Sequence, residues 1–109
     1  MEIVTREYRR VVVMRVTGRV DAATAPEFDA ALKAHSESRR SLVVELDGTQ
    51  YLSSAGVRAL ITVQKALKSG GARVVLAQPS ARVREVLDIA GLQPLFDVYD
   101  TTEAAVGSM

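Results

Sequence analysis

Two adjacent serines, Ser53 and Ser54, are the residues of this sequence best placed to support chemistry. They follow an apolar, strand-like run and precede a long amphipathic segment, so they lie where a helix should begin. The first turn of a helix has unpaired backbone N–H groups and a partial positive charge. A hydroxyl there can cap the helix, and a phosphate there would be stabilised. The pair therefore has two interpretations, a structural cap and a site of reversible phosphorylation.

Few other groups in the sequence could do chemistry. His35 is the single histidine, and its place on or near the apolar stripe of a predicted helix favours a structural role. Cysteine is absent, which removes disulfides, thiolate metal sites and cysteine nucleophiles. The sequence also has no serine nucleophile elbow, Walker loop or dinucleotide-binding glycine motif. We therefore predict no enzyme activity, no cofactor and no bound metal.

Length and composition narrow the class of protein. The chain has 109 residues, which suits one domain with one core. A net charge of +1 and an aromatic content of 5% give little support for binding nucleic acid or an acidic membrane surface. No apolar run approaches about 20 residues, and the start lacks a signal-peptide pattern. We expect a single cytoplasmic domain over residues 1–109, with neither nucleic acid nor membrane as a partner.

Strand-like and helical patterns alternate along most of the chain, which predicts parallel pairing with right-handed crossovers. The first two strands are close in sequence and should pair antiparallel. We predict the α/β class, with a small, mostly parallel sheet of four to five strands, an antiparallel N-terminal strand and about four helices. The expected strands are Glu2–Tyr8, Arg10–Thr17, Ser41–Leu46, Arg73–Ala77 and the short edge strand Phe96–Tyr99. We expect four helices. The first begins with a capping box at Thr24–Glu27, and the second runs from about Ser54 to Ser69. The third extends from Pro79–Ser80 to a stop at Gly91–Leu92, and a short fourth begins near Asp100–Glu103.

The segment from about Ser54 to Ser69 has the clearest helical pattern. Its apolar stripe includes Leu60 and Ile61, which we expect to be buried against the sheet. Arg58 falls on the more polar, exposed side of the same helix. The glycines Gly70–Gly71 should end the helix, because glycine readily adopts the conformation of a helix C-terminus.

Two acidic residues, Asp21 and Asp47, each follow a predicted strand. Capping of a loop is one interpretation for both, and we favour it for Asp47. If the two strands are adjacent and parallel, Asp21 would also lie beside the serine loop. Ligands of open α/β sheets bind at that edge. For Asp21, loop capping and a role in recognition both remain open.

Three segments together resemble one family over nearly the whole length of the chain. They are the run Leu46–Arg58 containing Ser53-Ser54-Ala55-Gly56, the turn Gly18-Arg19-Val20-Asp21, and the helix and stop over Ser80–Leu92. The chain resembles the STAS domain family, specifically the stand-alone anti-sigma factor antagonists of bacteria. This resemblance implies regulation of transcription through binding of an anti-sigma factor that is also an ATP-dependent serine kinase. It further implies a metal-dependent serine phosphatase that reverses the phosphorylation.

The family motif indicates which serine would be modified. Its acceptor lies two residues before the glycine, which corresponds to Ser54 when counted back from Gly56. Ser53 stands where the family often has Asp, and Ala55 where it often has Ser, so Ser53 is a second candidate. We expect a partner-binding site that consists of Asp21, Ser53, Ser54, Gly56 and Arg58. Ser53 and Gly56 would shape the loop of Ser54, Asp21 would border it, and Arg58 would contact the partner from the exposed side of the helix.

Two alternative functions remain open on the sequence alone. The first is another STAS role, as a subunit of a lipid transporter or as a scaffold in a sensing complex. The second is a phosphoryl-receiver-like domain, which needs clustered acids for Mg²⁺ and a nearby lysine. Asp21 and Asp47 supply at most part of such a cluster, and the later strand ends supply no lysine.

Overall fold

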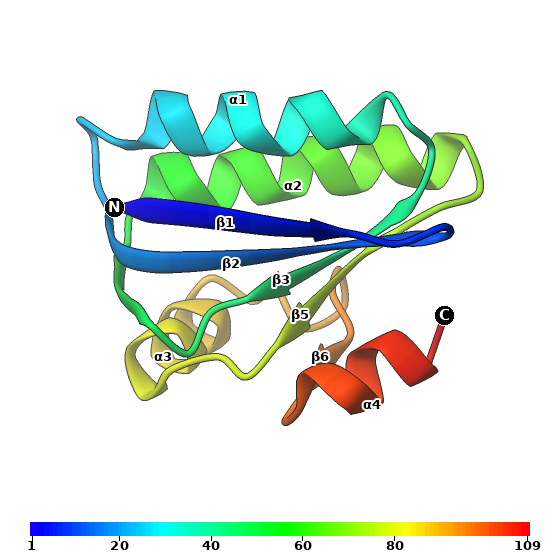
Figure 1. Ribbon diagram of the computed structural model, residues 1–109. Coiled ribbons are helices and arrows are strands. Elements are labelled where there is room, and N and C mark those ends of the chain that lie inside the picture. Colours follow the sequence, from blue (N-terminus) through cyan, green and yellow to red (C-terminus); the bar gives the residue numbers. More distant parts are fainter.

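Six strands form one mixed sheet flanked by helices in the computed structural model, which describes residues 1–109 (Figure 1). The predicted α/β class with an antiparallel N-terminal strand is confirmed. The strands are β1 (Glu2–Glu7), β2 (Val11–Val20), β3 (Ser41–Glu45), β4 (Thr49–Leu52), β5 (Val74–Ala77) and β6 (Val98–Tyr99). The helices are α1 (Ala25–Ser36), α2 (Ser54–Ser69), α3 (Ala81–Ile89) and α4 (Thr102–Gly107).

The sheet has the order β1-β2-β3-β5-β6, with β4 added beside β2. β1 and β2 pair antiparallel, and every other pair of strands is parallel. β3 and β5 are central strands whose valines and leucines are buried on both faces, as expected of parallel strands covered on two sides. Because β2 and β4 are parallel, their carboxyl ends lie at the same edge of the sheet, where α2 begins.

The course of β2 differs from our prediction. We expected the strand to end at Thr17, but it continues to Val20 through an irregularity at Gly18, whose φ is +99°. At this point the partner of β2 changes from β3 to β4, and the register shifts between Gly18 and Arg19. Glycine allows this change of direction because it adopts positive φ without steric cost.

The strand β4 was not predicted. Its four residues directly follow the turn-like Asp47-Gly48, so the segment appeared to be a loop. β4 matters because it positions the residues that follow it. Val20 pairs with Leu52, and the Ser53 N–H donates to the Val20 carbonyl at 2.8 Å. This pairing fixes the start of α2 against the end of β2.

Helices α1 and α2 lie side by side over one face of the sheet (Figure 1). Leu60 is fully buried there, which confirms its predicted place. Ile61 is only half-buried, because it lies at the margin of the stripe that faces the core. The sequence analysis missed Gln64, which is buried on the same helix. Its side-chain amide binds both the N–H and the carbonyl of Val74.

Two helix ends test the capping predictions. The prediction of a capping box at the start of α1 is wrong, because Thr24 has a helical backbone conformation and its side chain makes no capping hydrogen bond. The stop after α3 is confirmed. Gly91 has a φ of +65°, and the Leu92 N–H donates to the Leu87 carbonyl at 3.0 Å, as in a Schellman motif.

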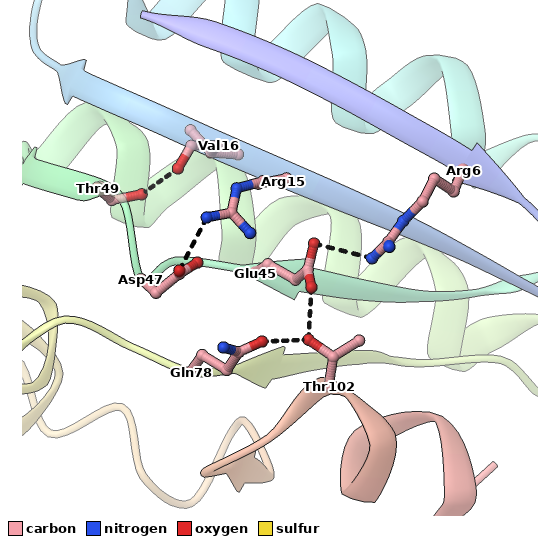
Figure 2. Close-up of polar contacts among 8 residues, drawn as sticks. All are labelled: Arg6, Arg15, Val16, Glu45, Asp47, Thr49, Gln78 and Thr102. Carbon is pink, nitrogen blue, oxygen red and sulfur yellow. Dashed lines mark hydrogen bonds and ion pairs between the residues drawn. The ribbon is translucent and has the colours of Figure 1, made fainter.

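The opposite face of the sheet carries α4 and a polar cluster that the sequence analysis did not predict. Glu45 is only 4% exposed although it ends an apolar strand. Figure 2 shows its carboxylate between Arg6, whose guanidinium lies at 3.1 Å, and the hydroxyl of Thr102. These contacts satisfy the buried charge, and the bond to Thr102 ties the first residue of α4 to the sheet.

Candidate functional site

The two serines at the start of α2 have different environments. Ser53 has an extended backbone, and its Oγ accepts a hydrogen bond from the Gly56 N–H at 3.2 Å. It is therefore the N-cap of the helix. Ser54 is the first helical residue, its side chain is exposed, and its hydroxyl makes no hydrogen bond within the protein. The structural role thus belongs to Ser53, which leaves the Ser54 hydroxyl free.

The first turn of α2 also presents unpaired backbone donors. The N–H groups of Ser54 and Ala55 have no acceptor within the protein, whereas the next two are taken by Ser53. The Gly56 N–H donates to the Ser53 side chain, and the Val57 N–H donates to the Ser53 carbonyl at 2.9 Å. Free N–H groups at a helix start favour a nearby anion.

Gly56 lets this turn sit close to the sheet. A Cβ at that position would lie 2.7 Å from Cδ1 of Leu52 and 2.8 Å from Cγ1 of Val20. Such distances are far below normal carbon contacts. Glycine therefore suits the close packing of α2 against the ends of β2 and β4, because a side chain here would displace Leu52 and Val20. Its place in the motif has a structural reason, whether or not it also contacts a partner.

Asp21 lies at the end of β2, beside the serine loop, but its carboxylate turns toward its own chain. Its Oδ1 accepts hydrogen bonds from the N–H groups of Ala23 at 3.0 Å and Thr24 at 3.1 Å. These bonds, led by the one from the Thr24 amide, lower the pKa of Asp21 below its ordinary value. The loop-capping interpretation is thus seen directly. A contact between Asp21 and a partner stays a prediction.

An aromatic contact beside this loop was missed by the sequence analysis. The Arg19 guanidinium lies 4.6 Å from the centre of the Tyr51 ring, across the β2–β4 pair. Its Nε lies 4.0 Å from the Asp21 carboxylate. This contact could have been predicted from the sequence only if β4 had been recognised as a strand, because the register of the β2–β4 pair places Arg19 opposite Tyr51.

Arg58 lines a shallow groove between α1 and α2. The lining of the groove includes small apolar side chains of the two helices, among them Ala25, Ala55 and Ala59. On its other rim, Asp29 and Lys33 form an ion pair at 2.8 Å. None of the ion pairs in the protein involves Arg58, and its side chain is exposed. Its guanidinium is therefore the unpaired charge of this groove.

Asp47 does not join the site. Figure 2 shows its carboxylate turned toward Arg15 on β2, with an oxygen 2.9 Å from the guanidinium. The favoured prediction of loop capping for Asp47 is therefore wrong, because its carboxylate forms this ion pair instead. No group of three or more His, Cys, Asp or Glu side chains is arranged to hold a metal ion. None of the helices has the length and apolar character required to cross a lipid bilayer.

The strand order and the serine at the head of α2 define the class of protein, a STAS-type α/β domain. The family profile of the STAS domain matches residues 2–105, so the chain belongs to this family. The structural comparison agrees with this assignment. The chain superposes on the unphosphorylated form of the anti-sigma factor antagonist SpoIIAA with a TM-score of 0.83 and 22% identity, covering 96% of this chain and 93% of that one.

Two relatives by sequence have names of the same type. BtrV of Bordetella bronchiseptica, whose name is "putative anti-sigma factor antagonist", is 35% identical over 92 residues, covering 84% of this chain and 79% of the relative. The anti-sigma-B factor antagonist of Staphylococcus aureus is 28% identical over 91 residues, covering 83% and 84%. The predicted resemblance to the STAS family is thereby confirmed.

Proposed function

We propose that this protein is an anti-sigma factor antagonist that is switched off by phosphorylation of Ser54. The observation that carries the proposal is the exposed Ser54 hydroxyl, free of hydrogen bonds, at the head of α2. The names of BtrV and of the Staphylococcus aureus relative support the general role. SpoIIAA, which shares the fold, has also been solved in a phosphorylated form.

The chemistry requires only an acceptor from this chain. A serine kinase, which we take to be the anti-sigma factor itself, transfers the γ-phosphoryl group of ATP to Oγ of Ser54. The hydroxyl proton passes to a base of the kinase, and ADP leaves. A metal-dependent serine phosphatase then hydrolyses the phosphoserine with water, which releases inorganic phosphate and restores the hydroxyl. These reactions would take place in the cytoplasm, where sigma factors bind RNA polymerase.

The expected effect of the phosphate falls on the complex rather than on the fold. A phosphoserine adds about −1.5 to −2 charges, and the start of α2 tolerates this charge because free N–H groups point toward it. The same charge would be buried against the partner in a complex. A cost of about 3 kcal/mol there would weaken binding ~100-fold, since about 1.4 kcal/mol is tenfold.

The remaining residues of the proposed site have supporting roles. Ser53 caps the helix and keeps the next serine at its head. Gly56 allows close packing of the turn, and Asp21 shapes the neighbouring loop. We include all of them in the partner-binding site because Ser53 and Gly56 belong to the same helix start as Ser54, and Asp21 follows the strand end that pairs with Leu52.

Three variants test the proposal, with purified partner and ATP and with mass spectrometry as the readout. The partner is obtained by affinity purification from the native cell with the Ser54→Ala protein as bait. That variant should bind the partner and resist inactivation by ATP. Ser54→Asp should bind more weakly while remaining folded. Ser53→Ala is the matched control, since it removes the neighbouring hydroxyl and should still be phosphorylated at Ser54.

Different results would reject different parts of the proposal. Phosphate found only on Ser53 would overturn the choice of residue. A captured partner without kinase activity would leave a binding module and remove the switch. Recovery of a transporter ATPase would favour the alternative role as a transporter subunit, and labelling by acetyl phosphate with Mg²⁺ would favour the receiver-like alternative.

A further inference from the structure

Arg58 is an unpaired cation on the same helix as Ser54, and its position relative to the serine suggests how the switch acts. Residues four apart on a helix lie on the same face, with Cβ atoms about 5–6 Å apart. Ser54 and Arg58 have this spacing at the start of α2. The guanidinium of Arg58 is therefore one turn away from any phosphate on Ser54, and its side chain is long enough to reach it.

The other side of Arg58 faces the groove between α1 and α2. The lining of that groove includes the small apolar side chains of Ala25, Ala55 and Ala59. Its other charged residues, Asp29 and Lys33, form an ion pair at 2.8 Å and so neutralise each other. An occupant of the groove therefore meets one uncompensated positive charge. A segment with small apolar side chains and a carboxylate complements that surface best.

We propose that Arg58 is the residue through which phosphorylation of Ser54 releases the partner. In the unmodified protein, the guanidinium binds a carboxylate of the anti-sigma factor at the rim of the α1–α2 groove. In the phosphorylated protein, it pairs with the phosphate one turn back, and the groove loses its cation. This inference rests on the proposed function. It adds that an acidic segment of the anti-sigma factor binds in the α1–α2 groove, and that Arg58 moves from the carboxylate of that segment to the phosphate.

The geometry supports an exchange of partners rather than simple repulsion. Arg58 has no competing carboxylate in this structure, so a phosphate would not have to break an existing ion pair. Arginine binds both carboxylate and phosphate through parallel hydrogen bonds, so one side chain can serve both states. Arg58 should also bind the phosphate in preference to the carboxylate of the partner, because the free N–H groups of the helix start hold the phosphate close to Arg58.

A double-mutant cycle tests the proposal on intact protein. Phosphoserine is installed at position 54 during translation, which makes the phosphorylated form without any kinase. Binding to the purified anti-sigma factor is then measured for the phosphorylated and unphosphorylated forms of wild type, Arg58→Gln and Arg82→Gln. The last variant is the control, since Arg82 is an exposed arginine on α3 with no ion pair.

We expect Arg58→Gln to weaken binding of the unphosphorylated protein by about 10-fold, as for loss of a charged hydrogen bond. Phosphorylation should then weaken this variant by only about 10-fold further, compared with ~100-fold in wild type and in Arg82→Gln. Equal phosphorylation factors in wild type and Arg58→Gln would overturn the proposal, and so would unchanged binding of unphosphorylated Arg58→Gln. If phosphoserine does not weaken wild-type binding at all, the proposed function itself fails.

A second measurement needs no partner. The second ionisation of the phosphoserine, followed by ³¹P NMR, should occur at higher pH in Arg58→Gln than in wild type by roughly 0.5 unit, because a nearby cation favours the dianion. Arg82→Gln should match wild type, and Arg58→Lys should lie between the two. Identical titration of wild type and Arg58→Gln would show that the guanidinium does not reach the phosphate, and would reject the exchange.

Discussion

Replacement of Gly56 by alanine tests whether the head of α2 is held by close packing. The added Cβ would lie 2.7 Å from Leu52 Cδ1 and 2.8 Å from Val20 Cγ1. Carbon atoms prefer separations of about 3.5–4.0 Å, so each contact is short by at least about 0.7 Å. Overpacking of this kind costs about 1–3 kcal/mol, while removal of a helical glycine recovers about 0.5–1 kcal/mol. We expect a net loss of about 1 kcal/mol in the free energy of unfolding, within the range of about 0–2.5 kcal/mol that these two terms give.

The measurement is urea unfolding of Gly56→Ala beside Gly107→Ala. The second variant is a matched control, because Gly107 is the last residue of α4 and a Cβ there meets nothing within 4 Å. It should be neutral or slightly stabilising. The m-values should be unchanged, so that a shift in midpoint reports stability alone. If Gly56→Ala were as stable as Gly107→Ala, the close packing argued for this turn would be wrong.

Three further predictions concern the core, a buried amide and a carboxylate. Leu60→Ala should destabilise the protein by about 2–5 kcal/mol because it leaves a cavity in the core. Ile61→Ala should cost clearly less because the Ile61 side chain is half-buried. Chemical denaturation measures both losses, and equal losses would contradict the assigned core face of α2. Gln64→Leu should cost about 1–3 kcal/mol for each β5 main-chain group left unpaired, measured by thermal unfolding, and a neutral result would refute the role of this amide. The pKa of Asp21 is lowered in the folded state, chiefly by the Thr24 amide, so its contribution to stability is complete above its ordinary value of 3.8 and is lost as the pH falls below it. The stability difference between wild type and Asp21→Asn should therefore shrink as the pH falls below 3.8, and a difference that stays constant from pH 7 down into acid would contradict this.

The elements with long, regular patterns could be predicted from the sequence. The helix over Ser54–Ser69 and the stop at Gly91–Leu92 both depend on local signals, namely a 3.6-residue period and a glycine in the left-handed region. The position of Ser54 follows from the same local signals, since a helix start is defined by the residues around it. The predicted place of the two serines was correct for this reason.

What could not be predicted depends on pairing between distant residues. The strand β4 is only four residues long, and it becomes a strand because β2 continues past Gly18 and offers it a partner. Without that pair, the contact of Arg19 with Tyr51 could not be found. The buried Glu45 is a similar case, because its partners Arg6 and Thr102 are 39 and 57 residues away in the chain.

The same dependence explains why Asp21 was left with two interpretations. Its backbone partners, the N–H groups of Ala23 and Thr24, are local, but their geometry appears only when Thr24 takes a helical conformation. An aspartate that accepts two backbone hydrogen bonds is already a structural residue. Recognition by Asp21 would have to use its second oxygen, which faces Arg19 at 4.0 Å. The structure therefore shows Asp21 shaping its own loop, and its contact with a partner stays a prediction.

The division of roles between Ser53 and Ser54 bears on how a single phosphate could act. The cap, the close packing at Gly56 and the hydrogen bond from the Ser53 N–H to β2 together hold the start of α2 by contacts that do not use the Ser54 side chain. A modification of that side chain therefore breaks none of these contacts. If the switch operates, its effect must come from charge on the surface and from the side chains that respond to it, among which Arg58 is the nearest unpaired cation on the same helix face. If Ser54 is phosphorylated as proposed, the contacts that hold the start of α2 would therefore remain in place in both forms of the protein.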